Sequence, residues 1–286
     1  MSIAYYNGEI CKPEEIRIPL SDRAVFFGDG IYDAAIGCDG KPYLLEEHIN
    51  RFLGNRKRLG IPLPLSENEL YDTVTKLCSQ YGDGCFFLYF QLSRYAEGRK
   101  HACHEKRRAN LLMTVTPAQM PRPDRRLKLI CYPDMRYGYC DIKTLNLLPS
   151  VMASSYAEAL GADEAIFVRD GVVTECAHSN ISIIRNGELI THPKTNRILP
   201  GIMRGELIRI CREMGINCRE EPFTRDELFR ADEVIVSSST KLFSLVDKID
   251  GIRLSRALAK KAGDGKASIG EKLTNFVYFS FVKSTK

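Results

Sequence analysis

The stretch EAIFVRDGVVTECAHSNISIIRNG, residues 164–187, contains three short apolar segments and two turn signals. Glu164–Val168, Val172–Ala177 and Ile181–Arg185 have the length and the β-branched composition of strands. Asp170-Gly171 and Asn186-Gly187 favour two-residue hairpin turns, because both residue types tolerate positive φ. Strands joined by such turns pair antiparallel. The stretch therefore predicts an α+β (mixed α/β) fold with mixed sheets rather than a doubly wound parallel sheet.

The same signals extend along the rest of the chain. Two further hairpins are predicted, over Ile3–Ile10 through Asn7-Gly8 and over Tyr32–Leu44 through Asp39-Gly40. The periodicity and the stop signals predict helices over Glu46–Leu59, Glu67–Tyr81, Pro149–Leu160 and Gly201–Met214. Further strands are predicted over Cys85–Ser93, Asn110–Thr116, Leu127–Cys131 and Glu233–Ser237, and a last element over Asn275–Val282.

A proline-rich stretch near the middle of the chain, TPAQMPRPD at residues 116–124, indicates a domain boundary. We predict an N-terminal α/β domain over residues 1–117, a linker over 118–124 and a larger C-terminal domain over 125–286.

The composition restricts the classes of partner. Lys and Arg (41) exceed Asp and Glu (36) by only five, which suits a protein that handles small anions better than one that wraps nucleic acid. No apolar run approaches the length that spans a membrane. The ten cysteines include no C-x2-C pair, and the first residues lack a signal-peptide pattern. We therefore expect reduced cysteines and a cytoplasmic protein without membrane or nucleic-acid partners.

Residues 140–148, CDIKTLNLL, place Lys143 in a segment whose alternation predicts a strand that enters an apolar core. A lysine at a strand end usually extends its ammonium to water along its own methylenes. A lysine held in an apolar setting instead has a lowered pKa and a neutral amine that can act as a nucleophile. The segment alone does not decide between these two interpretations.

Other candidates for chemistry are a buried acid and several anion ligands. Glu175 lies in an apolar strand and needs a cationic partner, for which a protonated pyridine nitrogen or an arginine would serve equally well. The helix that begins at Gly201 offers N–H groups to an anion, and Ser237–Thr240 and Arg51 could add donors. Ordinary helix capping and solvated surface charge are the alternative interpretations.

A basic stretch follows the strand that ends at Arg94, and it is by default a solvated loop. Its residues Arg99 and His101 alternate, so they would point the same way from an extended segment and could bind a carboxylate together.

Taken together, these segments resemble the pyridoxal-phosphate-dependent enzymes of fold type IV, the class IV aminotransferases, across nearly the whole chain. The resemblance is carried by DRAVFFGDGIYD (22–33), EHINRF (47–52), DIKTLN (141–146), Thr174-Glu175 ahead of Ser179-Asn180, LPGIMR (199–204) and Ser238-Ser239. It is closest to the D-amino-acid aminotransferases. It implies a two-domain fold whose larger C-terminal domain is a pseudo-barrel.

The resemblance also implies roles for individual residues. Lys143 would form the Schiff base with pyridoxal 5′-phosphate and act as the catalytic base, and Glu175 would pair with the pyridine nitrogen. Leu199 would pack on the ring, and the phosphate would be bound by Arg51, Ile202, Met203, Ser238 and Ser239. Tyr32 would bind the substrate carboxylate together with Arg99 and His101 from a second subunit, which implies a homodimer. No metal site is expected.

The activity implied is ping-pong transfer of an amino group from a D-amino acid such as D-alanine to a 2-oxo acid such as 2-oxoglutarate. Cys176-Ala177-His178 departs from the D-amino-acid enzymes, and Thr174-Glu175-Cys176 is similar to the aminodeoxychorismate lyases. A lyase and a branched-chain L-amino-acid aminotransferase therefore remain as alternatives, and the role of His178 stays open.

Overall fold

The computed structural model describes residues 2–95, 99–103, 108–254 and 267–285 of the 286-residue chain. The chain forms two compact units. The first comprises Met1–Met120, Ile142–Asn146 and Phe281–Lys286, and the second comprises Pro121–Asp141 and Leu147–Ser280. The units are not continuous in sequence, unlike the domains predicted with a linker at 118–124. The predicted domain boundaries stay a prediction.

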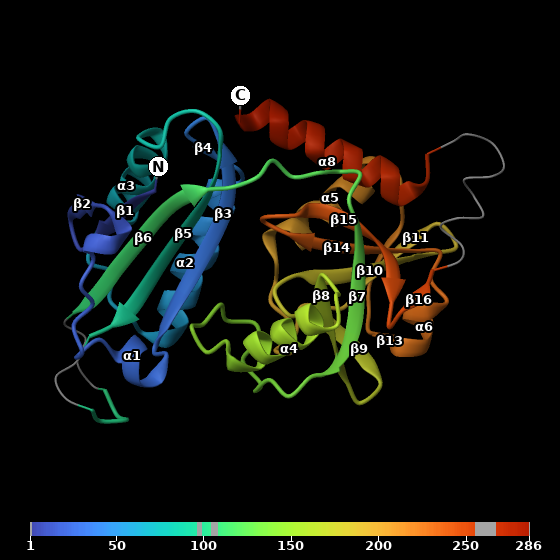
Figure 1. The fold of residues 1–286 in the computed structure, drawn as a ribbon, viewed down its shortest axis with the longest axis horizontal. Coiled ribbons are helices and arrows are strands. Elements are labelled where there is room, and N and C mark those ends of the chain that lie inside the picture. The colour runs from blue at the N-terminus through green and yellow to red at the C-terminus, as the bar shows by residue number, and fades with distance from the viewer. Residues whose placement is uncertain (1, 96–98, 104–107, 255–266, 286) are drawn as a thin grey trace. The chain divides into compact units, whose positions relative to one another are not determined.

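The first unit is built on a six-stranded sheet in the order β2-β1-β6-β5-β3-β4, in which all neighbours are antiparallel (Figure 1). Its helices α2 (Leu45–Leu59) and α3 (Glu67–Ser79) bury their apolar stripes on one face of this sheet, in a single core cluster. The strands are β1 (Ile3–Tyr6), β2 (Glu9–Cys11), β3 (Gly30–Cys38), β4 (Lys41–Pro42), β5 (Cys85–Arg94) and β6 (Ala109–Pro117). The short helices η1 (Pro13–Glu15) and α1 (Arg23–Phe27) complete the unit.

The predicted hairpin turns are confirmed by the backbone. Asp170 and Gly171 both adopt positive φ, 53° and 77°, which is the conformation that a two-residue turn between twisted strands requires. The same Asn/Asp-Gly pattern occurs with positive φ at Asn7, Asp39 and Asn186, and also at Asp250, where the sequence analysis did not anticipate a hairpin. Local sequence therefore determines these five hairpin connections.

The strand predicted around Lys143 is wrong. Residues 142–146 add to the edge of β3 only through an isolated bridge between Ile31 and Thr144. Two backbone hydrogen bonds hold this contact, from Tyr32 N to Lys143 O at 3.0 Å and from Leu145 N to Gly30 O at 3.1 Å. The apolar alternation reflects the burial of Ile142 in the core of the first unit, not a regular ladder.

The second unit is built on a larger sheet in the order β12-β11-β10-β14-β15-β7-β8-β9-β13, with β16 paired to β15. The β7–β8, β7–β15 and β11–β12 pairs are parallel and the others antiparallel, so the predicted mixed α+β fold is confirmed. The strands are β7 (Arg126–Pro133), β8 (Glu164–Arg169), β9 (Val172–Cys176), β10 (Asn180–Arg185), β11 (Glu188–Thr191), β12 (Cys218–Glu220), β13 (Phe223–Thr224), β14 (Glu233–Ser238), β15 (Leu242–Ile249) and β16 (Ile252–Arg253).

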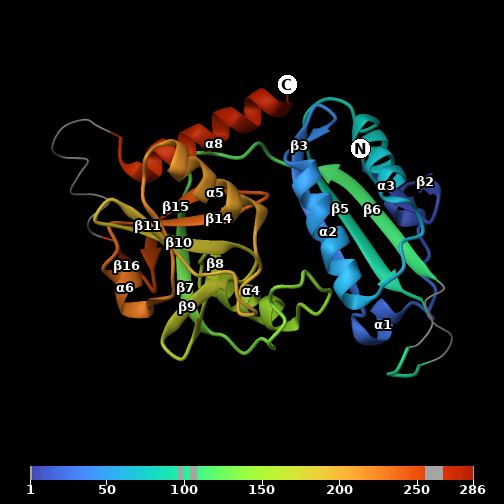
Figure 2. The ribbon, with the colours of Figure 1, turned by 180° about the vertical axis from the view of Figure 1, so that it is seen from behind.

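Two helices of the second unit matter for the site. Helix α4 (Leu148–Ala159) packs on β7 and β8, and α5 (Ile202–Glu213) lies across β14 and β15 (Figure 2). The remaining helices are α6 (Arg225–Phe229) and α8 (Ile269–Thr285). Among the described residues, no helix combines the length and the apolar character needed to cross a membrane.

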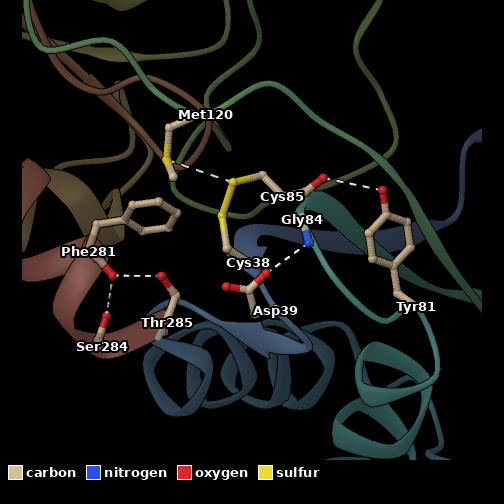
Figure 3. Close-up of a disulfide and its surroundings, with 9 residues drawn as sticks. All are labelled: Cys38, Asp39, Tyr81, Gly84, Cys85, Met120, Phe281, Ser284 and Thr285. Atoms are coloured by element: carbon tan, nitrogen blue, oxygen red, sulfur yellow. Dashed lines mark hydrogen bonds between the residues drawn. A yellow bond between two sulfur atoms is a disulfide. The ribbon is translucent and has the colours of Figure 1, made fainter.

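The expectation that all cysteines are reduced is wrong for two of them. Cys38 and Cys85 form a disulfide (Figure 3). They are directly opposite each other at the ends of β3 and β5, where the antiparallel register brings their Cα atoms within 4.0 Å. Proximity of this kind arises from strand pairing, which a search for local C-x2-C spacing does not detect. The other eight cysteines are free thiols.

We expect the denatured protein, prepared without reductant, to present eight reactive thiols in a thiol titration rather than ten. Cys38→Ser should lower the free energy of unfolding of the oxidised protein by about 4 kcal/mol, because the bond closes a loop across 47 residues. Cys11→Ser, at a free thiol of β2, is the matched control. Ten thiols, or equal urea midpoints for the two variants, would contradict the disulfide.

Candidate active site

Lys143 contacts an aromatic side chain of the first unit. Its Nζ lies 4.2 Å from the centroid of the Tyr32 ring, on β3, and Tyr32 in turn stacks on Tyr89 of β5 at a centroid distance of 5.4 Å. Lys143 itself is half-buried. The ammonium therefore packs against the π face of the Tyr32 ring.

Arg51 of α2 is held by a buried carboxylate. Its Nε and Nη2 each donate to Asp33 at 2.8 Å, one to each oxygen, and His48 Nδ1 lies 2.7 Å from Asp33 Oδ1. Asp33 is completely buried. Burial raises the pKa of Asp33, but the charge of Arg51 and the hydrogen bonds from His48 and Arg51 outweigh it and hold this pKa well below its usual range. The pair therefore stays ionised, and the guanidinium has a fixed orientation.

Glu175 of β9 lies at the centre of a hydrogen-bond network in the second unit. Only 5% of the residue is exposed, and its Oε2 accepts hydrogen bonds from Asn180 Nδ2 at 2.9 Å and from the Leu199 backbone N–H at 3.0 Å. Its Oε1 pairs with Arg136 Nη1. Of the two cationic partners considered for Glu175, the structure thus supplies the arginine.

Arg136 is part of a larger charged cluster. Its Nε donates to Asp134 Oδ1 at 2.9 Å, and its guanidinium lies 4.3 Å from the centroid of the Phe167 ring. Burial lowers the pKa of Arg136, but the hydrogen bond to Asp134 and the charges of Glu175 and Asp134 raise it above its ordinary value. Burial raises the pKa of Asp134, but the hydrogen bond to Arg136 and the charge of Arg136 outweigh this effect, so the pKa lies below its ordinary value. Glu175 therefore sits beside a permanent cation and remains a hydrogen-bond acceptor.

The start of α5 packs directly against this network. Gly201 is the N-cap, and no side chain caps the helix, so the N–H groups of Ile202 and Met203 lack partners within the helix. A Cβ atom on Gly201 would lie 2.0 Å from Asn180 Oδ1, so only glycine fits. Asn180 also donates to Leu199 O at 2.9 Å. One asparagine thus joins the buried acid to an uncapped helix N-terminus, which favours anions.

Ser238 and Ser239 lie at the end of β14 and in the turn that follows it. The Ser238 hydroxyl accepts the backbone N–H of Lys241 at 3.3 Å. The preceding Ser237 is directly opposite Asn180 in the β10–β14 register. The turn therefore follows β14, which is the neighbour of β10, and β10 begins at Asn180.

Arg99 and His101 both contact Phe27 of α1. The Arg99 guanidinium lies 5.3 Å from the Phe27 ring centroid, and the His101 ring lies 5.2 Å from it. Arg23 fixes the backbone between them, because its Nη1 donates to Lys100 O at 2.5 Å and its Nη2 to His101 O at 3.0 Å. Within the described part of the chain, neither Arg99 nor His101 forms a hydrogen bond or ring contact with Tyr32 or Lys143.

The structure thus groups the predicted site residues into sets. Lys143 contacts Tyr32, Arg99 lies beside His101, and Glu175 is linked through Leu199 to Ile202 and Met203. Arg136 and Lys241 were not anticipated, because nothing in the local sequence distinguishes them from surface charges. Among the described residues, no group of histidine, cysteine and carboxylate side chains could hold a metal ion.

Comparison with known proteins places these features in a family. Residues 30–249 match the sequence model of the family described as Amino-transferase class IV. The chain is 37% identical to the D-alanine aminotransferase of Bacillus licheniformis over 250 residues, which is 86% of this chain and 88% of the relative. It is 36% identical to the D-alanine aminotransferase of Staphylococcus epidermidis over 255 residues, 88% of this chain and 90% of the relative.

Solved structures share the fold. The branched-chain aminotransferase of Thermoproteus uzoniensis with norvaline superposes with a TM-score of 0.84 at 23% identity, covering 99% of this chain and 95% of the other. The branched-chain amino acid aminotransferase of T.th. with pyridoxamine 5′-phosphate has the same TM-score at 22% identity, with the same coverage. At this level of identity, the likeness concerns the fold alone.

We expect Asp33→Asn to lower the free energy of unfolding by about 3–5 kcal/mol at neutral pH, because it leaves the Arg51 charge buried without its partner. The pKa of Asp33 is lowered by folding, so its stabilising effect is complete above the unfolded value of about 3.9 and is lost as the pH falls toward the folded value. The difference in urea midpoint between wild type and Asp33→Asn should therefore shrink on acidification. Asp72→Asn, at an exposed position of α3, is the control. A difference that grows in acid would contradict this assignment.

Proposed function

The chain belongs to the class IV aminotransferases, and from this premise we propose that it transfers the amino group of a D-amino acid such as D-alanine to a 2-oxo acid such as 2-oxoglutarate. The observation that carries the proposal is the identity of 33–37% to D-alanine aminotransferases over at least 86% of this chain. The fold, which it shares with other aminotransferases, is consistent with this activity.

The cofactor of this family is pyridoxal 5′-phosphate, and the residues present fit it. An amine beside an aromatic face, a buried ionised carboxylate and an uncapped helix start are the groups that its aldehyde, its ring nitrogen and its phosphate require. When bound, the cofactor supplies an electron-withdrawing ring that stabilises negative charge at the substrate α-carbon. Lys143 would supply the amine that attaches the cofactor and, once released, the base that takes the proton from the substrate α-carbon.

The remaining cofactor ligands divide between the two ends of the cofactor. Glu175 would accept a hydrogen bond from the protonated ring nitrogen, and the ion pair with Arg136 holds the Glu175 carboxylate in place. Leu199 covers the ring face. The phosphate takes donors from Arg51, from the N–H groups of Ile202 and Met203, and from Ser238 and Ser239. These contacts retain the cofactor through the half-reaction in which Lys143 is not attached to it.

Substrate handedness follows from the position of the substrate carboxylate. Tyr32, with Arg99 and His101 of a second subunit, binds it, and the α-hydrogen of a D-amino acid then faces Lys143. The Arg23 and Phe27 contacts support this role, because they hold Arg99 and His101 in place without substrate. An L-amino acid would present its α-hydrogen to Lys143 only with the carboxylate on the opposite side.

The likeness to the lyases rests on a residue of the core. Cys176, the third residue of Thr174-Glu175-Cys176, is 1% exposed and packs in the apolar cluster of the second unit. Burial raises the pKa of its thiol well above the ordinary value, so it stays protonated. The Cys176 side chain is therefore part of the apolar core and makes no contact with a substrate.

A homodimer would complete the carboxylate site, and α4 supports one. This helix is apolar around most of its circumference, yet it buries only Ala153 and Ala157. Four of its large apolar side chains are exposed to about half or more, namely Leu148 (70%), Val151 (56%), Met152 (55%) and Tyr156 (47%). A helix of this composition is normally covered on more than one side. A second copy of the chain is the occupant we propose, because the same partner would supply Arg99 and His101.

We infer a cytoplasmic location from the cysteines. Eight of the ten are free thiols, which is typical of a reducing compartment. The Cys38–Cys85 bond is a single cross-strand link, not a disulfide framework.

A screen of paired D- and L-amino acids with 2-oxoglutarate tests the activity. We expect turnover with D-alanine, D-glutamate or D-aspartate and little with their L-enantiomers, measured as 2-oxo acid formed. Lys143→Ala should abolish turnover. Arg99→Ala should lower kcat/KM for D-alanine by about 10- to 100-fold, since it removes a charged hydrogen bond to the carboxylate, and should leave the cofactor absorbance intact.

The controls separate the alternatives. His178→Ser changes the residue whose role the sequence leaves open, and we expect it to keep the preference for D-amino acids. Turnover only with L-leucine, L-isoleucine or L-valine would show a branched-chain aminotransferase instead. Pyruvate release from aminodeoxychorismate without an amino acceptor would show a lyase.

The dimer is tested by sedimentation equilibrium, in which we expect a mass twice that of the 32.3 kDa chain. Leu148→Glu combined with Val151→Glu should shift the protein toward the monomer, because it places charges on the apolar surface of α4. Ile252→Glu, at an equally exposed apolar position of β16, should leave the mass unchanged. A monomeric wild-type protein would contradict the proposed interface.

A further inference from the structure

Glu164, the first residue of β8, is a completely buried carboxylate outside the network around Glu175. Its Oε1 accepts the backbone N–H of His178 at 2.8 Å, and its Oε2 accepts the Ser179 hydroxyl at 2.9 Å. The ammonium of Lys241 forms an ion pair with Oε2 and lies 3.5 Å from the Ser179 hydroxyl. Only 15% of the Lys241 side chain is exposed.

The partners of Glu164 come from two separate connections. His178 and Ser179 lie between β9 and β10, and Lys241 ends the turn between β14 and β15. Glu164 belongs to neither connection, and it contacts both through the two oxygens of one carboxylate. A single buried side chain therefore ties the two connections together.

Each of these connections adjoins residues of the proposed cofactor site. The first follows Glu175 and leads into Asn180, which donates to Glu175 Oε2. The second begins with Ser238 and Ser239, and the Ser238 hydroxyl accepts the Lys241 backbone N–H. One connection thus joins the strand of the proposed ring-nitrogen partner to Asn180, and the other begins with the proposed donors for the phosphate.

The turn between β14 and β15 needs outside support. Leu242, the residue after Lys241, has a φ of 53°, in the left-handed region that costs energy for any residue with a Cβ atom. Leu242 is also buried, so its side chain cannot relax into solvent. Strained backbone of this kind persists only where surrounding contacts determine it, and the Lys241–Glu164 pair is such a contact.

Net stabilisation is a weak explanation for this pair. A buried ion pair roughly balances its own desolvation, and apolar side chains of similar size would serve stability as well. The alternative use of such a pair is to fix geometry, since both charges are satisfied in only one arrangement.

We propose that Lys241 is a positioning residue for cofactor binding: by pairing with Glu164, it holds the turn that carries Ser238 and Ser239 at a fixed place relative to the connection that follows Glu175. The inference rests on the proposed function, because it takes these serines as phosphate donors. It assigns Lys241 to the phosphate end of the cofactor without direct contact. Loss of the pair should therefore weaken binding of the phosphate and spare binding of the ring.

The test compares two ligands that differ only in the phosphate. Wild type, Lys241→Met and the control Lys248→Met, at a lysine of strand β15 that follows the turn, are titrated with pyridoxal 5′-phosphate and with pyridoxal, and the absorbance of the complex is followed. We expect Lys241→Met to weaken pyridoxal 5′-phosphate binding by about tenfold or more and to leave pyridoxal binding unchanged. Lys248→Met should bind both ligands as wild type does. Lys241→Arg keeps a cation beside Glu164 and should therefore bind the phosphorylated ligand more tightly than Lys241→Met does.

If Lys241→Met does not fold, the double variant Glu164→Gln/Lys241→Met buries no unpaired charge and should show the same selective loss. Equal weakening of both ligands would show a general structural role and overturn the proposal. If Lys241→Met and the double variant both bind pyridoxal 5′-phosphate with wild-type affinity and keep transamination activity, the proposed role of Lys241 is overturned and the proposed function stands. A wild-type protein that binds neither ligand would instead overturn the proposed function, and this inference with it.

Discussion

An ionised carboxylate can be buried only where a cation and hydrogen-bond donors surround it, and the region around Glu175 is organised by that requirement. Arg136 supplies the charge, and Asn180 and the Leu199 backbone supply donors. Satisfying Glu175 in this way fixes the loop before α5 and brings Gly201 so close to Asn180 that no side chain fits there. The position of the helix start, and with it the direction of its N–H groups, follows from the pairing of one acid.

The same principle recurs at other proposed ligands. Arg51 is oriented by Asp33, and the turn after β14 is held by Glu164 through Lys241. In each case the residue proposed to meet the cofactor, or the segment that carries it, is held by a buried ion pair. Buried ion pairs add little net stability, but they permit few alternative arrangements. An enzyme that must retain a cofactor while its covalent attachment is broken and remade benefits from ligands held in this way.

Strand alternation separates two of these networks. Successive side chains of β3 point to opposite faces of the sheet, so Tyr32 and Asp33 have different surroundings although they are adjacent in sequence. Tyr32 lies against Lys143 and Tyr89, and Asp33 pairs with Arg51 and His48 of α2. A shift of one residue in the register of β3 would exchange the two environments and disrupt both networks.

Local signals were sufficient for most of the secondary structure and for selecting several candidate residues. The Asn-Gly and Asp-Gly turns lie where the dipeptides predict them, because positive φ is a property of those residues themselves. The helix that ends at Gly60 and the helix that begins after Gly201 follow from capping and periodicity in the same way. Lys143 and Glu175 could be selected as candidates because a charge in an apolar segment is visible in the sequence.

The partners of those charges were decided only by the tertiary structure. Arg136 and Glu175 are separated by 39 residues, and Lys241 and Glu164 by 77, and no local pattern distinguishes such an arginine or lysine from a solvated one. The bond between Cys38 and Cys85 likewise follows from strand register across 47 residues. The strand expected around Lys143 failed for the converse reason: Ile142 is buried in the core of the first unit, but the segment meets β3 through an isolated bridge and forms no ladder of its own. The sequence by itself therefore determined the local conformations and the charges that need partners, and tertiary contacts determined which partners they have, because pairing depends on distances in space that sequence separation does not contain.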